Sequence, residues 1–218
     1  MKLKTIVLSL AVLAAVAACK SQFETLLSSN DVDAKYKAAM ELFNNGKYLK
    51  AGQLFESMAI LTDGTERDDT VRYYWALSNY RYKDFYTTES NFAKFIEKYP
   101  QSPFTSDARF LRIDCLYRAT LRWELDQTPT RACLATITEY LTEYPTDGPH
   151  VEACAQMIND LRDRLDRMAF ENARIYYKME DYLAARVALR NVLKDNADNG
   201  YARISCTTPP WPPTTMPG

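Results

Sequence analysis

The sequence is short of the residues that enzymes and metal proteins commonly use. Its 218 residues include 6 glycines and one histidine, His150. We find no glycine-rich phosphate loop and no GxSxG nucleophile motif. His150 follows Pro149 and has no cysteine or histidine neighbour at ligand spacing, so we interpret it as a surface-loop residue rather than a zinc ligand. We therefore expect no enzymatic activity, no metal and no other cofactor.

The chain also lacks an excess of charge of either sign. Its 27 Lys and Arg and 28 Asp and Glu residues give a formal net charge of −1, which does not point to nucleic acid as a partner. The hydrophobic fraction of 47% and the charged fraction of 25% are ordinary for a globular protein. Little glycine with much alanine, leucine and tyrosine favours helices.

Cysteine pairs at redox or zinc-ligand spacing are missing as well. Cys115, Cys133 and Cys154 fall within predicted helices, and Cys206 lies beyond them. An oxidising compartment would permit disulfides, but no CxxC motif is present. We interpret these cysteines as small buried hydrophobic residues.

The first 18 residues have the pattern of a secretion signal. A basic start precedes an apolar run that is shorter than the roughly 20 residues of a membrane-spanning helix. Small residues lead directly into Cys19, as in a bacterial lipobox, where the cysteine becomes the acylated N-terminus. We predict a signal peptide over 1–18, lipidation of Cys19 and a lipid-anchored linker over 19–30. The alternative is a plain signal peptide that happens to contain a cysteine.

The residues after Cys19 indicate a destination. Lys20 stands where an aspartate would resemble the inner-membrane retention signal of enteric bacteria. Glu24 stands alone, without the acidic cluster of surface-exported Bacteroidetes lipoproteins. By this resemblance we expect the periplasmic face of the outer membrane.

An internal repeat over residues 31–200 is the main structural signal. Segments 36–48 and 73–85 align so that aromatic residues coincide at three positions and alanine at a fourth. The frame recurs from Phe170, and each copy continues into a second helix. We predict an all-α fold of stacked helical hairpins, a short α-solenoid, because no hairpin can bury its apolar face alone. The aligned residues are Tyr36/Tyr73/Phe170, Ala39/Ala76/Ala173, Phe43/Tyr80/Tyr177, Tyr48/Phe85/Tyr182 and Ala51/Thr88/Ala185.

Polar turns are expected inside the hairpins at 44–46, 82–84 and 178–181. A less regular unit has helices predicted over 106–121 and 131–144, separated by an insertion at 122–129. A long helix is predicted from about Val151 into the last unit, because its apolar residues recur at helical spacing.

The carboxylates do not form an evident catalytic pair. Glu66, Asp68 and Asp69 lie in one loop, where we interpret them as favourable charges at the N-terminus of a helix predicted over 70–81. Charges of alternating sign at 162–167 are interpreted as a solvated helix face.

The repeat resembles the tetratricopeptide pattern in its small residues and in the prolines Pro100 and Pro145 that end two units. The tryptophan and glycine of that pattern's first helix are missing here. In that family the fifth and twelfth positions of the first helix face a concave groove. The resemblance implies a peptide-binding groove, although these rings could instead pack between repeats. The residues concerned are Tyr36, Phe43, Tyr73, Tyr80, Phe170 and Tyr177.

Between about residues 29 and 200, the chain resembles the BamD family of lipoproteins, most closely its Bacteroidetes forms. The segments that carry this resemblance are FAKFIEKYP at 92–100, LDQT at 125–128, LRDRL at 161–165 and ARIYY at 173–177. The resemblance implies a non-catalytic periplasmic scaffold that binds the insertase subunit of the barrel-assembly machinery and unfolded outer-membrane proteins. One alternative is a different periplasmic repeat adaptor that serves a cell-wall or envelope complex. Such a protein would share every feature except the order of these motifs. A SusD-type glycan-binding lipoprotein is disfavoured because that family is far longer.

The tail over 201–218 departs from the repeat. Its prolines cannot form the helix that should cap the last hairpin. One permitted set of codons from Arg203 onward, read in a shifted frame, encodes Tyr-Tyr-Thr-Ala-Met-Ala-Ala-Tyr, which parallels residues 73–80. We hypothesise a frameshift near Tyr201, which would leave Val187, Leu189 and Val192 partly bare. The alternative is a natural Pro-rich tail, disordered or polyproline-like.

Overall fold

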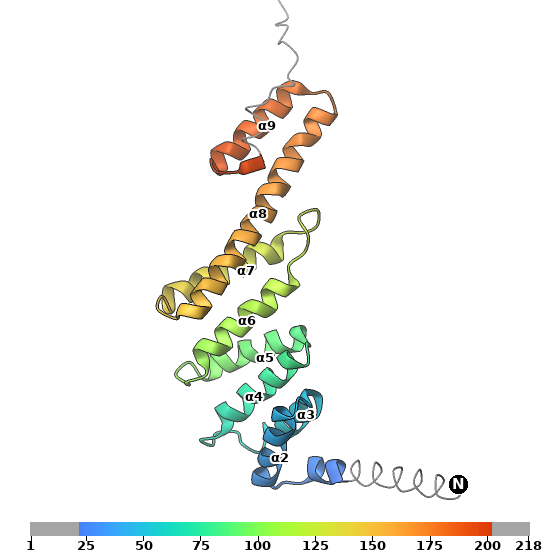
Figure 1. Ribbon diagram of the computed structural model, residues 1–218, viewed down its shortest axis with the longest axis vertical. Helices are drawn as coiled ribbons and strands as arrows, with labels where there is room; N and C mark the ends of the chain where they lie inside the picture. Colours follow the sequence, from blue (N-terminus) through green and yellow to red (C-terminus); the bar gives the residue numbers. More distant parts are fainter. Residues whose placement is uncertain (1–21, 202–218) are drawn as a thin grey trace, which may run out of the picture. The chain divides into compact units, whose positions relative to one another are not determined.

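The computed structural model describes residues 22–201, and within this range the protein contains helices and no strand (Figure 1). The predicted all-α fold is confirmed, because neighbouring helices pair as hairpins. A helix over 22–28 precedes the labelled elements. These are α2 (Val32–Asn44), α3 (Tyr48–Met58), α4 (Asp68–Arg81), α5 (Phe85–Lys98), α6 (Thr105–Ala119), α7 (Thr128–Glu143), α8 (Gly148–Lys178) and α9 (Tyr182–Asp195).

Three hairpin turns share one backbone conformation, at the positions that the sequence predicts. Gly46, Lys83 and Glu180 have φ of 73°, 69° and 64°, which is the left-handed region. The next residue is the N-cap of the following helix, and the carboxylates of Asp84 and Asp181 accept hydrogen bonds from backbone N–H groups in the first turn of that helix. Only the first turn has glycine at the left-handed position, where that conformation carries no steric penalty.

The chain divides into two compact units, residues 1–115 and 116–218. In the first unit, the small residues of the repeat lie where the helices approach each other. Ala39, Ala51 and Ala76 are fully buried. A Cβ atom on Gly52 of α3 would lie 3.5 Å from the Cβ of Ser78 in α4. Bulkier side chains at these positions would therefore push the helices apart.

The predicted linker over 19–30 is partly helical and docked. Phe23, Leu26 and Leu27 pack against the core of the first hairpin. The buried Lys35 donates from Nζ to the carbonyl oxygen of Leu27 at 2.9 Å and to Oγ of Ser57 at 3.1 Å. A cation at the last carbonyls of a helix is favourable, so Lys35 fixes helix 22–28 to α2 and α3.

In the second unit, the predicted 122–129 insertion is an ordered loop as far as Gln127, and its last two residues already belong to α7. Gln127 is buried, and its Nε2 donates to the carbonyl oxygens of Arg122 and Leu125 at 2.8 and 3.0 Å. Its Oε1 accepts a hydrogen bond from Thr130, in the first turn of α7. This explains why α7 begins a few residues earlier than predicted.

The long helix is confirmed as α8, which pairs with α7 along its N-terminal half and with α9 along its C-terminal half (Figure 1). Of its 162–167 charges, Arg162, Asp163 and Arg167 are exposed, as a solvated face predicts, whereas Arg164 and Asp166 are half-buried. Arg164 donates to Oγ1 of Thr120 at 2.7 Å, and the Arg167 guanidinium lies 4.6 Å from the Trp123 ring centre. These arginines therefore hold the 120–127 loop against α8.

The frameshift hypothesis predicts that apolar residues of the last hairpin are partly exposed, and the structure bears this out for only some of them. Leu189 is buried in a cluster with Phe170 and Ala173, whereas Val187 is half exposed. Tyr201 stacks on Phe170 and covers this side of the cluster. The predicted exposure of Leu189 is therefore wrong. The residues beyond 201 lie outside the described range.

The cysteines at 115, 133 and 154 are buried thiols that form no disulfide, as predicted. Burial raises the pKa of the Cys154 thiol to about 11, with a smaller contribution from Asp147. A thiol with so high a pKa is poorly ionised and therefore unreactive near neutral pH. Cys19 and Cys206 lie outside the described residues.

Candidate interaction site

Tyr73 and Tyr80, both predicted groove residues, project from α4 toward α6. Tyr73 is 6% exposed, and its ring stacks on Phe104 with centres 4.5 Å apart. Its hydroxyl donates to Asp107, and the Tyr80 hydroxyl donates to Oδ2 of Asp114 at 2.8 Å. Burial, followed by the hydrogen bond to Asp107, raises the pKa of Tyr73. These tyrosines therefore attach one repeat to the next.

Tyr36 and Phe43 occupy the corresponding positions of α2 and are half-buried. The Tyr36 ring packs edge-on against Phe55 at 6.2 Å, and Phe43 packs edge-on against Tyr74 at 5.5 Å. Burial is the largest cause that raises the pKa of Tyr36, and the neighbouring Tyr74 adds to it. Part of each ring remains accessible at the edge of the first hairpin.

Phe170 and Tyr177 hold the corresponding positions of α8. Phe170 is 8% exposed and packs in the core of the last hairpin. Tyr177 is half-buried and packs edge-on against Tyr182 at 5.4 Å. The six predicted residues thus form two groups. Tyr73 and Phe170 are core residues, and the other four rings keep an exposed part.

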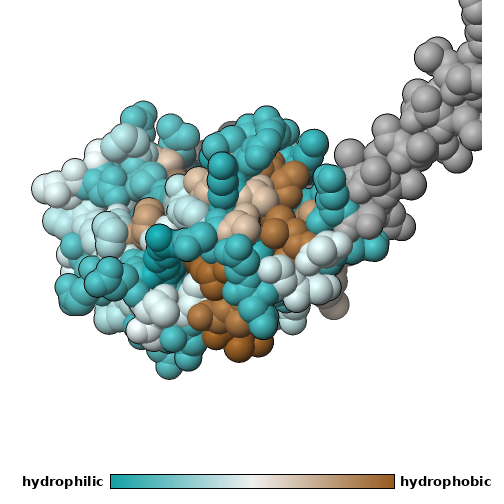
Figure 2. Space-filling view, turned by 90° about the horizontal axis from the view of Figure 1, so that it is seen from below, coloured by the Kyte–Doolittle hydropathy of each residue, from teal (hydrophilic) through white to brown (hydrophobic). Residues whose placement is uncertain are grey.

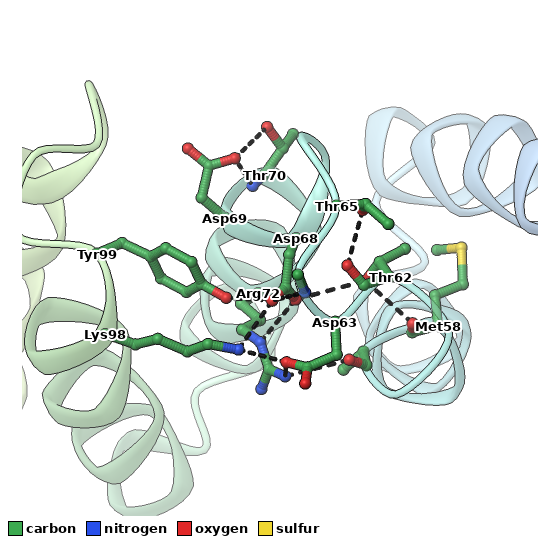
Figure 3. Close-up of polar contacts among 12 residues, drawn as sticks. Met58, Thr62, Asp63, Thr65, Asp68, Asp69, Thr70, Arg72, Lys98 and Tyr99 are labelled. Atoms are coloured by element: carbon green, nitrogen blue, oxygen red, sulfur yellow. Dashed lines mark hydrogen bonds and ion pairs between the residues drawn. The ribbon is translucent and has the colours of Figure 1, made fainter.

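A buried carboxylate at the start of α4 was not recognised from the sequence. Asp68 lies in the first turn of α4, as expected for a helix-terminal acid, but it is 1% exposed. Oδ1 accepts from Nε of Arg72 at 2.8 Å, and Oδ2 accepts from Nζ of Lys98 at 2.9 Å (Figure 3). The Tyr99 hydroxyl and the N–H of Gly64 also donate to Oδ2.

These contacts join three segments of the first unit: the 59–67 loop, the start of α4 and the end of α5. Burial alone would raise the pKa of Asp68, but the hydrogen bonds from Lys98, Tyr99, Arg72 and Gly64 together lower it to about 2. Lys98 and Tyr99 belong to the 92–100 motif. That motif therefore has a structural role, because it attaches the end of α5 to the start of α4 and to the 59–67 loop.

The accessible surface mixes polar and apolar side chains. Figure 2 views the first unit from the side of α2 and shows hydrophilic residues interrupted by hydrophobic patches. Tyr86 and Ile60 are the most exposed large hydrophobic residues, at 91% and 86%. Within residues 22–201, no group of acidic, histidine and cysteine side chains is placed to hold a metal ion. No helix of this range is long and apolar enough to cross a membrane.

Stacked helical hairpins with partly exposed aromatic rings define a helical-repeat protein whose surfaces suit contacts with other proteins. The model of the YfiO family, described as outer membrane lipoprotein, matches residues 28–205. The chain belongs to this family, which is of the BamD type expected from the sequence. A search of curated proteins found no match.

Proposed function

We propose that this protein is a non-catalytic scaffold lipoprotein of the machinery that assembles β-barrel proteins in the outer membrane. In this role it binds the barrel-insertase subunit and unfolded outer-membrane proteins, and it faces the periplasm. The family match over residues 28–205 is the observation that carries the proposal. The likeness of the 92–100 and 125–128 segments to Bacteroidetes members supports that branch of the family.

The proposed anchor is acylated Cys19, with palmitate among its acyl chains. Its own position lies outside the described residues. Helix 22–28 begins three residues later, and Lys35 attaches this helix to the first hairpin. A lipid on Cys19 would therefore hold the first repeat close to the membrane surface. More than one acyl chain is required for a stable anchor, since each buried CH₂ contributes about 0.8 kcal/mol.

The proposed client site is the set of accessible aromatic rings in the first unit, at Tyr36, Phe43 and Tyr80, and Tyr177 is the equivalent ring of the second unit. Barrel proteins commonly end in an aromatic-rich strand, and aromatic rings are favourable partners for such a segment. Tyr73 and Phe170 are buried, and each belongs to the core of its own unit.

Affinity purification of the tagged full-length lipoprotein from detergent-solubilised outer membranes tests the scaffold role. We expect the barrel-insertase subunit to co-purify in comparable amounts. Recovery of a cell-wall or other envelope complex in its place would support the adaptor alternative and would refute this proposal.

The client site can be tested with a peptide that copies the terminal strand of an outer-membrane barrel protein. Tyr36→Ala should weaken binding of this peptide while lowering stability only modestly. Tyr73→Ala is the matched variant, and it should cost about 3–5 kcal/mol of stability because it empties a buried aromatic site. Unchanged peptide affinity in stable Tyr36→Ala protein would rule out a role for this ring in binding.

A further inference from the structure

The hairpins of the first unit have two opposite edges. Helices α2 to α5 alternate in direction, and the antiparallel packing is clear between α3 and α4, where Phe55 stacks on Tyr74 and Gly52 approaches Ser78 (Figure 1). The α2–α3 and α4–α5 turns therefore lie at one edge of the unit. The 59–67 loop, which joins α3 to α4, lies at the opposite edge.

Helix 22–28 begins at the edge that holds the two turns. Nζ of Lys50, in the first turn of α3, lies 5.1 Å from the ring centre of Phe23. The other end of the helix is attached near the start of α2, where Lys35 donates to the carbonyl oxygen of Leu27. Helix 22–28 thus runs antiparallel to α2, and its first residues lie beside the α2–α3 turn.

The position of this helix places the proposed lipid anchor at the same edge. Cys19 precedes the first described residue, Gln22, by three residues. Three residues span at most about 11 Å even when fully extended. An acylated Cys19 would therefore bring the edge that holds the two turns up to the bilayer.

Three large hydrophobic side chains are exposed at this edge. Leu49 is 49% exposed, Tyr82 is 53% exposed and Tyr86 is 91% exposed. Leu49 and Tyr86 are equivalent in the repeat, because each is the second residue of its helix, α3 or α5. Side chains in the first turn of a helix lean toward its N-terminus, so these two point past the turns and away from the hairpins.

The cations beside these side chains are accessible and unpaired. Lys47, Lys50, Arg81 and Lys83 are exposed, and none of them forms an ion pair with another described residue. Lysine and arginine next to tyrosine and leucine are typical of surfaces at a membrane–water interface. We refer to this set of residues as the basic edge: Lys47, Leu49, Lys50, Arg81, Tyr82, Lys83 and Tyr86.

Carboxylates are fewer at the basic edge. Asp84 is half-buried and accepts a hydrogen bond as the cap of α5. Glu24 and Glu41 are exposed in the adjoining first turn of helix 22–28 and last turn of α2. The basic edge thus keeps an excess of positive charge.

The opposite edge also exposes apolar side chains, but its charge is negative. Ile60 is 86% exposed, and Leu61 is 39% exposed. The accessible cations there, Arg67, Arg72 and Lys98, are all ion-paired. Charge therefore distinguishes the two edges, although apolar exposure does not. The carboxylates of the opposite edge are Asp31, Asp33, Asp63, Glu66, Asp68 and Asp69.

We propose that the basic edge lies against the anionic phospholipid surface of the membrane that holds the lipid anchor. The four cations face lipid phosphates, and Leu49, Tyr82 and Tyr86 enter the headgroup region. A flat bilayer can contact all these side chains at once, although they come from three helices. The inference rests on the proposed function only in that it takes Cys19 as the anchor.

The test compares lysine reactivity in two kinds of liposome. The full-length lipoprotein is reconstituted into phosphatidylcholine liposomes, with or without phosphatidylglycerol, and acetylation of each lysine by a soluble reagent is followed by mass spectrometry. The anchor tethers the protein in both cases, so a difference reports headgroup contact. We expect Lys47, Lys50 and Lys83 to react about threefold or more slowly in anionic liposomes, and high salt to remove the difference. Lys37 and Lys94, exposed elsewhere on α2 and α5, are internal controls that should not change.

Two double variants separate the contributions of charge and apolar contact. With Lys47→Gln and Lys83→Gln, the remaining Lys50 should react in anionic liposomes almost as fast as in neutral ones. Leu49→Ser with Tyr86→Ser should at least halve the slowing. Ile60→Ser is the matched control, because Ile60 is about as exposed as Tyr86 but lies at the opposite edge, and it should keep the slowing in full. Thermal unfolding of all variants should match the wild type, because the substituted side chains are exposed.

Three results would overturn the proposal. The first is equal reactivity of the basic-edge lysines in neutral and anionic liposomes. The second is an equal slowing of Lys37 and Lys94, which would mean that no particular face meets the lipid. The third is slowing in native outer membranes but not in anionic liposomes, which would assign the basic edge to a protein partner.

The outcomes for the basic edge and for the proposed function can be told apart. A protein without the lipid would not float with neutral liposomes, which refutes the anchor. Lysine reactivity in an excess of anionic liposomes would still judge the basic edge. If the basic-edge lysines are slowed but the barrel-insertase subunit does not co-purify, the lipid contact stands and the scaffold function fails.

Discussion

Replacing Asp68 with asparagine would test the network that closes the first unit. The substitution keeps the size of the side chain and removes the charge that Arg72 and Lys98 neutralise. The pKa of Asp68 is about 2 in the folded protein, against an ordinary value of 3.8. With 1.36 kcal/mol per pKa unit, this difference corresponds to about 2 kcal/mol of folding free energy near neutral pH.

The direction of the pH dependence follows from the lowered pKa. The unfolded chain takes up the proton first as the pH falls, so the stabilisation is complete well above pH 3.8 and is lost between about pH 4.5 and pH 2. Asp68→Asn lacks this titration. The wild type should therefore be more stable than the variant by about 2 kcal/mol at pH 6, and by less than about 0.5 kcal/mol at pH 2.

Urea unfolding followed by circular dichroism, repeated across this pH range, measures the difference directly. Asp63→Asn is the matched control, because Asp63 pairs with the same two cations but is 61% exposed. It should change stability by less than about 1 kcal/mol, as other exposed ion pairs do. If the difference in unfolding free energy between the wild type and Asp68→Asn does not change with pH, Asp68 is not the buried, charged centre described above.

Further predictions concern the turns, the anchor and the tail. Lys83→Gly should stabilise the protein by about 0.5–1 kcal/mol by relieving a left-handed conformation, and Gly46→Ala should destabilise it by about 1 kcal/mol, both measured by urea unfolding. Lys35→Met should cost about 1–3 kcal/mol and speed amide exchange in residues 22–28, because two hydrogen bonds from a charged group are lost. Cys19→Ser should move the protein to the soluble fraction; retention in the outer membrane with an unchanged signal peptide would contradict lipidation. Sequencing the gene through residues 202–218 tests the frameshift, which is excluded if the frame is intact and its shifted codons encode no repeat-like helix.

The features that depend on neighbours in the sequence could be predicted. The hairpin turns follow from local breakers and polar residues, and the buried positions of Ala39 and Ala51 follow from their recurrence in a fixed frame. The long α8 was predictable because its apolar residues recur at helical spacing.

Features that depend on distant partners could not be predicted in the same way. In the sequence, Asp68 has the features of an ordinary acid at a helix N-terminus. Its burial depends on hydrogen bonds from Lys98 and Tyr99, which lie at the end of another helix. The buried Lys35 gives no local signal either, since its partners lie on two other helices. Tyr73 and Tyr80 share the seven-residue spacing of Asp107 and Asp114, so their hydrogen bonds could have been anticipated from the repeat alone.

The central claim is that this lipoprotein serves the assembly of outer-membrane β-barrels. Depletion of the protein in its own bacterium, followed by quantitative proteomics of the outer membrane, tests it most directly. The account predicts a general loss of barrel proteins, while other lipoproteins stay at their normal level. Unchanged barrel proteins after full depletion, or a defect confined to the cell wall, would contradict it.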